Sequence, residues 1–202
     1  TTVMPQLMKL KDLKVDYIWS NTYHSTVDVV LKEMAQAGVK ILIAGNTNHP
    51  VDGQIMISGP DITEGYIACT MNYSEDYEPR EGLPKDFLEL MKKAGKRRGG
   101  AKIHTQLYSR GWQHAMLYRE AIRLALKEVG FEGLNGEAMM EYGIMRIKDY
   151  KTPLTKMPSG LTSKDDRRLN PYVRFDKAKG GKSVPLSGWL KAPWLKKVVE
   201  NK

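Results

Sequence analysis

The chain has 202 residues, of which 41% are hydrophobic and 27% charged, a composition typical of a globular protein with one full core or two small ones. Its apolar runs are all shorter than the roughly 18 residues that a membrane-spanning helix needs, and its one cysteine, Cys69, excludes an internal disulfide. The formal net charge is +9, but the basic residues are scattered, and no zinc-finger, helix-turn-helix or RNA-binding signature accompanies them. We interpret them as solvated faces and expect no nucleic-acid partner; anionic lipid headgroups or an acidic docking partner are the alternatives.

The first pattern along the chain, after a short helix within residues 1–14, is a strand, a helix and a second strand. Residues 15–19 are apolar, aromatic and β-branched, which predicts a strand buried on both faces, and residues 39–44 predict the next strand. Such a βαβ unit forms a parallel sheet, whose ligands bind beyond the carboxyl ends of the strands.

The helix between these strands carries two boundary signals. Ser25 and Asp28 form an approximate capping box at its start, and Gly38 predicts a left-handed cap at its end. Its apolar stripe consists of Val27, Val30, Leu31, Met34 and Ala35.

The chain then alternates once more between helix and strand before its composition changes. A short helix is predicted at 52–58 and a third strand at 66–71, where Cys69 is interpreted as a packed core residue rather than a nucleophile. The acidic, proline-containing segment 72–84 is predicted to cross to another part of the molecule.

Mostly helices follow, and a β-hairpin returns near the end of the chain. Helices are predicted at 84–94, ended by Gly95, at 105–129, ended by Gly130, and after Asn135, which is the predicted cap. The buried stripe of the long helix is predicted to be Tyr118, Ile122, Ala125, Leu126 and Val129. The hairpin is predicted within 172–186. The chain thus begins with an α/β part, continues with helices and ends with a β-hairpin. This layout predicts two lobes joined by several crossings.

No arrangement of residues along the chain indicates catalysis or a metal site. The four histidines, His24, His49, His104 and His114, show no metal-ligand spacing. Gly181-Lys182-Ser183 resembles the end of a phosphate-binding loop but lacks its first glycine and its helix, so a hairpin turn is the better interpretation. We therefore expect no catalytic residue, no metal and no cofactor.

Polar residues follow the first two strands, and these are the candidate binding residues. They are Asn21, Thr22, Tyr23, Asn46 and Thr47. Tyr23 has a second interpretation as a loop aromatic packed on the start of the helix. A phenol with amide and hydroxyl neighbours at the strand ends is, however, typical of a small-ligand lining.

Several stretches together resemble a known family. They are Pro5-Gln6-Leu7 to Leu10, VDYIW at 15–19, LKEMAQAGVK at 31–40 with Gly45, Thr63-Glu64-Gly65-Tyr66, SKDDRR at 163–168, and WLKAPW at 189–194. Their order and spacing resemble the type I periplasmic solute-binding proteins of branched-chain amino acid ABC importers, over nearly the whole chain. The resemblance implies an α/β flytrap fold with a parallel-sheet lobe and the helices of a second, incomplete lobe.

The resemblance also implies a domain layout and partners. Residues 1–73 and 152–202 would form the second, C-terminal lobe, and 74–151 the crossing and helices of the first lobe, with the family's N-terminal portion absent. The implied partners are a small-molecule ligand and a membrane ABC permease, with the absent portion or a second copy covering exposed apolar surface. The implied location is periplasmic or extracellular.

The candidate residues agree with the family's pattern at one position and depart from it at another. Tyr23 matches a tyrosine that contacts the ligand in the family. Asn46-Thr47 stands where an acidic residue usually receives the ligand's ammonium, which implies a different ligand. The implied function is solute binding in a cleft between the lobes for an ABC importer; a ligand-sensing receptor module of the same fold and a diverged α/β enzyme are the alternatives.

Overall fold

The computed structural model describes residues 2–72, 85–97, 105–155 and 172–191. Contacts within the chain divide it into two compact units. Unit 1 comprises residues 1–79, 104–107 and 174–189, and unit 2 comprises residues 80–103, 108–173 and 190–202.

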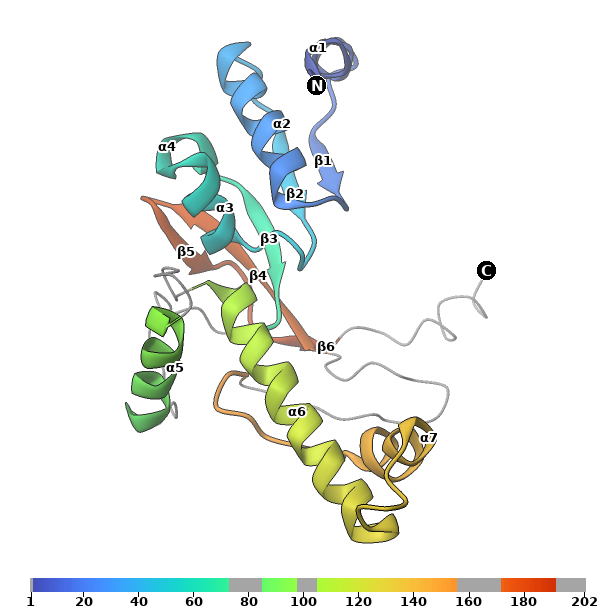
Figure 1. The fold of residues 1–202 in the computed structure, drawn as a ribbon. Helices are drawn as coiled ribbons and strands as arrows, with labels where there is room; N and C mark the ends of the chain where they lie inside the picture. Colours follow the sequence, from blue (N-terminus) through green and yellow to red (C-terminus); the bar gives the residue numbers. More distant parts are fainter. Residues whose placement is uncertain (1, 73–84, 98–104, 156–171, 192–202) are drawn as a thin grey trace. The chain divides into compact units, whose positions relative to one another are not determined.

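Unit 1 contains most of the sheet and the helices that pack on it (Figure 1). Its elements are α1 (Met4–Asp12), β1 (Tyr17–Ser20), α2 (His24–Gln36), β2 (Leu42–Gly45), α3 (Val51–Ser58), α4 (Pro60–Thr63), β3 (Ile67–Thr70), the first two residues of α6 (Gln106–Val129), most of β4 (Tyr172–Lys179) and β5 (Lys182–Pro185). The strand order is β1-β2-β3-β4-β5. The first three strands are parallel, and β4 and β5 are antiparallel to their neighbours. The α/β class and the βαβ unit are thereby confirmed.

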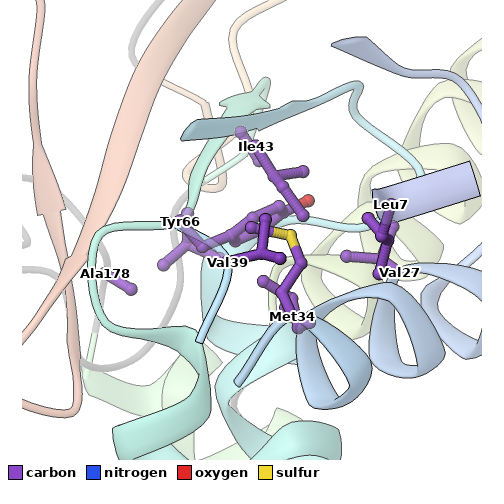
Figure 2. Packing of buried hydrophobic residues seen from close by; sticks show 10 residues of the cluster. Leu7, Val27, Met34, Val39, Ile43, Tyr66 and Ala178 are labelled. Carbon is purple, nitrogen blue, oxygen red and sulfur yellow. The ribbon is translucent and has the colours of Figure 1, made fainter. Parts of the chain in front are cut away.

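The core of unit 1 lies between its helices and one face of the sheet. The stripe predicted on α2 is confirmed at Val27, Leu31 and Met34, which are buried in one cluster with Ile43 of β2 (Figure 2). Gly38 adopts φ +62°, the left-handed conformation predicted where α2 ends.

Two predictions about the βαβ unit were wrong. β1 is an edge strand with one covered face, so Tyr17 and Trp19 are 63% and 53% exposed instead of buried. The capping box does not form, because α2 begins at His24 and Ser25 lies inside the helix. No side chain caps the first turn of α2, and Asp28 bonds to Ser58 instead.

The C-terminal hairpin is confirmed, with longer strands than predicted. β4 continues to Lys179, so the turn consists of Gly180 and Gly181 alone, with φ +58° and +73°. Two successive positive φ values match the twist of a two-residue hairpin and favour glycine. Lys182 and Ser183 therefore lie in β5 and not in a phosphate-binding loop.

Unit 2 is mostly helical. Its elements are α5 (Lys85–Arg97), the remainder of α6, α7 (Gly136–Ala138), the π-helical η1 (Met139–Gly143), the 3-10 helix η2 (Ile144–Arg146), the first two residues of β4, and β6 (Leu190–Lys191), which pairs with them. Gly130 adopts φ +67° just after α6, and the Asn135 side chain accepts a hydrogen bond from the Ala138 N–H, so both boundary predictions are confirmed. The predicted stop at Gly95 was wrong, because α5 continues to Arg97.

The buried face of α6 differs from the predicted stripe. The prediction is confirmed at Ala125, which is fully buried, but Tyr118 and Ile122 are 58% and 40% exposed. Ala121, which lies outside the predicted stripe, is also fully buried. Gly143 of η1 approaches α6 so closely that a β-carbon there would lie 2.7 Å from the Ala121 carbonyl oxygen. Such a close approach of two backbones needs small side chains, which hydrophobicity alone does not indicate.

Other predictions lie mostly or wholly outside the described residues. They concern the crossing segment 72–84, the helix start at Pro84, His104, and the stretches SKDDRR and WLKAPW. Among the described helices, none has the length and apolar character needed to cross a membrane.

Candidate functional site

The ends of β1 and β2 lie side by side and bring two of the predicted residues together. Ser20 and Gly45 are opposite each other at the end of the parallel ladder, and the Asn46 N–H donates to the Ser20 carbonyl at 3.2 Å. Beyond this point the Asn46 Nδ2 donates to the Asn21 Oδ1, and the Asn46 Oδ1 accepts from the Asn48 N–H at 2.8 Å. The Nδ2 end of the Asn46 amide thus joins the two loops, and its Oδ1 end holds the loop after β2 in shape.

Thr22 and Thr47 lie on these same two loops. The Thr22 hydroxyl is 2.9 Å from the Ser20 hydroxyl, and Thr22 is exposed. Thr47 is half-buried directly after Asn46. The two loops therefore present hydroxyl and amide groups at one edge of the sheet.

Tyr23 occupies the position just before α2, with φ −111° and ψ 164°. Its carbonyl accepts from the N–H groups of Thr26 and Val27, so its backbone is fixed by the helix. Its side chain is 74% exposed. The ring therefore makes little contact with the helix start, and its contact with a ligand stays a prediction.

A buried hydrogen-bonded pair supports the loop after β2, and sequence analysis did not single it out. The His49 Nδ1 lies 2.5 Å from the Tyr66 phenol oxygen, and that phenol donates to the His49 carbonyl at 2.9 Å. Because the phenol hydrogen is directed to the carbonyl, the imidazole carries its hydrogen on Nδ1. His49 is fully buried and Tyr66 is 2% exposed.

Burial keeps both members of this pair neutral at physiological pH. Burial lowers the pKa of His49, and the nearby His24 lowers it further, while the carbonyls of His49 and Ser20 act in the opposite direction. Burial also raises the pKa of Tyr66 far above its usual range, with a smaller contribution from Cys69.

A second hydrogen-bonded chain joins α2 to α3 beside this pair. The His24 Nδ1 and the Gln54 Oε1 are 2.9 Å apart, and the Gln54 Nε2 donates to the Ser58 hydroxyl at 2.7 Å. Ser58 in turn donates to Asp28 at 2.7 Å, and Lys32 pairs with Asp28 at 2.9 Å. These contacts fix the start of α2, and with it Tyr23.

The structure contains two further regions that resemble sites, one polar and one hollow. Asp176 of β4 neutralises Arg174 through an ion pair of 2.6 Å inside unit 1, which is a structural arrangement. In unit 2 an apolar hollow of about 130 Å³ contains none of the predicted binding residues. It is lined by His114, Leu117, Tyr118, Ile144 and Ile147. Within the described part of the chain, no group of three or more His, Cys, Asp or Glu residues could hold a metal ion.

Comparisons with known proteins find likeness in structure and none in sequence families. No protein-family model and no curated protein matches the chain. A branched-chain amino acid ABC transporter protein from Thermus thermophilus, solved with bound valine, has TM-score 0.79 and 22% identity, over 98% of this chain and 51% of that one. An extracellular ligand-binding receptor from Rhodopseudomonas palustris has TM-score 0.72 and 19% identity, over 93% and 52%. A leucine-binding protein from Thermotoga maritima has TM-score 0.66 and 16% identity, over 93% and 48%.

These likenesses show the fold. The chain has part of the type I periplasmic-binding-protein fold that the sequence resemblance implied, and it spans about half the length of the solved structures it matches. Those structures are binding proteins and receptors rather than enzymes.

Proposed function

We propose that this chain is part of an extracytoplasmic solute-binding protein that delivers a small polar organic solute to an ABC permease in the membrane. The observation that carries the proposal is the fold shared, over more than nine tenths of the chain, with transporter proteins that include valine- and leucine-binding ones. The same likeness supports a periplasmic or extracellular location and a permease partner, which are part of the proposal.

The ligand-binding residues in this proposal are Asn21, Thr22, Tyr23, Asn46 and Thr47. They supply one exposed aromatic ring, two amides and two hydroxyls, which is a set of neutral donors and acceptors. The first turn of α2, uncapped by any side chain, adds the positive end of a helix dipole beside Tyr23. A hydrogen-bond acceptor of the ligand, such as a carboxylate, would be stabilised at this positive end of the helix.

The absence of charge among these five residues also bears on the ligand. A free ammonium that is buried needs a carboxylate or several oxygen acceptors, and the Asn46 Oδ1 already accepts from Asn48. We therefore propose an amino-acid-like or simple carboxylate ligand whose amino group contributes little to its affinity.

The lobes of the whole protein belong to the proposal as well. Residues 1–73 and 152–202 would form the C-terminal lobe, and residues 74–151 the crossing and helices of the first lobe. Closure of such lobes on the solute, which presents a surface to the permease, stays a prediction that the shared fold supports.

The test is calorimetric titration with valine and with 3-methylbutanoate, its analogue without the amino group. Both are expected to bind, with dissociation constants within about tenfold of each other.

Tyr23→Ala should weaken binding and leave the melting temperature within a few degrees, because the side chain is 74% exposed. Tyr17→Ala is the matched control, since Tyr17 is 63% exposed at the other end of β1. Equal affinities of the Tyr23 and Tyr17 variants would refute the site.

A receptor module that senses the same kind of ligand is the second candidate, favoured by the likeness to an extracellular ligand-binding receptor. Recovery of the protein with an ABC permease would support transport, whereas a signalling segment in the same gene would support sensing. Mass spectrometry of small molecules that co-purify with the protein identifies the ligand in either case. Turnover of that molecule would instead indicate an enzyme.

A further inference from the structure

The imidazoles of His24 and His49 lie close together at the loop of residues 45–50, to which His49 belongs. The ring centroids of His24 and His49 are 6.1 Å apart, with the rings inclined by 72°. His49 is fully buried, and its Nδ1–H is bonded to the Tyr66 phenol. The imidazole can therefore accept a further proton only at Nε2, an atom buried without a hydrogen-bond partner.

The space around the rings is tightly filled. A β-carbon at Gly45 would collide with His49 and with the Tyr66 hydroxyl, and one at Gly53 would lie 2.8 Å from the His24 ring. The backbone at Gly45 therefore lies directly against the His49 ring, and the backbone at Gly53 lies against the His24 ring. A charged imidazole would have to remain in place or displace the backbone around it.

The titratable groups on the elements packed around His49 do not offer it a counter-charge. They include His24 and Asp28 of α2, Asp52 of α3, Tyr66 directly before β3, and Cys69 of β3. Asp28 is engaged by Ser58 and Lys32, and Asp52 accepts the N–H groups of Gly53 and Gln106. Burial raises the pKa of the Cys69 thiol, which therefore stays neutral.

We propose that His49, locked to Tyr66 and packed against His24, is an acid-sensitive switch that holds the loop of residues 45–50 in place at neutral pH and releases it in mild acid. The Tyr66 phenol bonds both the ring and the carbonyl of His49, so a shift of the charged ring breaks both contacts. Asn46 and Thr47 lie on this loop, and under the proposed function its release would also release the ligand.

The direction of the effect follows from proton linkage. Burial and the neighbouring His24 lower the pKa of His49 in the closed loop, whereas an opened loop returns the imidazole to its ordinary value near 6.5. The open state thus binds the proton more tightly. Opening is expected to become up to tenfold more favourable for each pH unit below about 6.5, until the pKa of the closed state is reached.

The test is amide hydrogen exchange of the ligand-free protein between pH 7.5 and 5, with each rate divided by its intrinsic rate at that pH. The peptide of residues 45–54 should lose protection below about pH 6.5, while the peptide of residues 117–125 in α6 should not. His114→Gln, which removes an exposed histidine of α6, should leave this transition unchanged. Equal behaviour of the two peptides would overturn the switch.

Two variants separate the switch from simple loosening of the loop. Tyr66→Phe removes the phenol and should expose the 45–54 amides already at pH 7.5. His49→Gln removes the titrating imidazole. Exchange of these amides, once divided by the intrinsic rate at each pH, should then no longer depend on pH. If that variant does not fold, NMR titration of wild-type His49 decides the matter, because a pKa above 6.5 contradicts the proposal.

The measurement is independent of ligand binding. Tyr23→Ala should abolish or weaken ligand binding and keep the exchange transition, because the Tyr23 side chain is 74% exposed and takes no part in the hydrogen bonds between His49 and Tyr66. A transition without ligand binding would leave the switch standing and remove the proposed function. Ligand binding without an exchange transition would leave the proposed function standing and overturn the switch.

Discussion

Arg174 and Asp176 form an ion pair within one strand, with the Arg174 Nε 2.6 Å from the Asp176 Oδ1 and an Arg174 Nη 2.8 Å from the Oδ2. Residues two apart on a strand point to the same face of the sheet, which lets the two side chains meet. Arg174 is 2% exposed and Asp176 is 1% exposed, and the Trp189 ring lies 5.2 Å from the guanidinium carbon. Each charge is therefore tolerated in the interior because the other is present.

Loss of one partner should destabilise unit 1 strongly. Asp176→Asn leaves a buried guanidinium without its carboxylate, and we expect the free energy of unfolding to fall by about 3–5 kcal/mol, measured by urea denaturation. Asp176→Asn combined with Arg174→Met removes both charges and keeps an oxygen acceptor for Ser183. The double variant should be more stable than the single one; a double variant equally damaged would show that the loss comes from packing and not from charge.

Gly45 should not accept a side chain. A β-carbon at this position would collide with the Tyr66 hydroxyl and the His49 ring, both of which are buried and held by each other. Gly45→Ala should therefore lower the free energy of unfolding by about 1–3 kcal/mol. Gly111→Ala is the matched control, because Gly111 lies in α6 with open space around its Cα, and the change should raise stability by about 0.5–1 kcal/mol. A stable Gly45→Ala protein would contradict the tight packing at the end of β2.

The features that could be predicted from the sequence are those set by local chemistry. The Gly180-Gly181 turn, the Asn135 cap and the end of α6 at Gly130 each depend on one or two residues with particular backbone or side-chain preferences. The nearness of Asn21 and Asn46 followed from a general rule, since the carboxyl ends of neighbouring parallel strands meet at one edge.

The features that could not be predicted depend on what packs against an element. Tyr17 and Trp19 have the composition of a buried strand, but β1 lies at the edge of the sheet and has one covered face. Ala121 is buried because Gly143 approaches it, a contact between residues far apart in the sequence. The bond between His49 and Tyr66 likewise joins two connecting segments, before α3 and before β3, and no spacing along the chain indicates it.

Asp28 should make stability depend on pH in the acid range. Burial by itself would raise its pKa, but hydrogen bonds from Lys32 and Ser58 outweigh it, so the pKa of Asp28 lies below its ordinary value of 3.8. A carboxyl with a lowered pKa stabilises the fold above the unfolded value, and this contribution is lost as the pH falls below about 4.

The corresponding test compares two variants that disrupt the same pair. Asp28→Asn keeps an acceptor for Ser58 and removes the charge, and it should lower the free energy of unfolding at pH 7 by less than about 1 kcal/mol, because the Lys32 side chain is 47% exposed. Lys32→Met should produce a similar loss. Urea denaturation at pH 7 and pH 3 measures both, and a difference from wild type that is as large at pH 3 as at pH 7 would contradict the charge as its source.

Asn135 should stabilise the helical segment that follows α6. Its side-chain oxygen accepts the Ala138 N–H at 2.9 Å at the start of α7, and α7 continues into η1, whose Gly143 packs on Ala121. Asn135→Ala leaves that N–H without its acceptor, so we expect unit 2 to lose about 1 kcal/mol of stability. Asn135→Asp is the control, because it retains an acceptor and adds a negative charge at the positive end of the helix, and it should match or exceed wild type. Thermal and urea unfolding of the three proteins measures the effect, and equal stability of the alanine variant and wild type would show that the cap does not contribute.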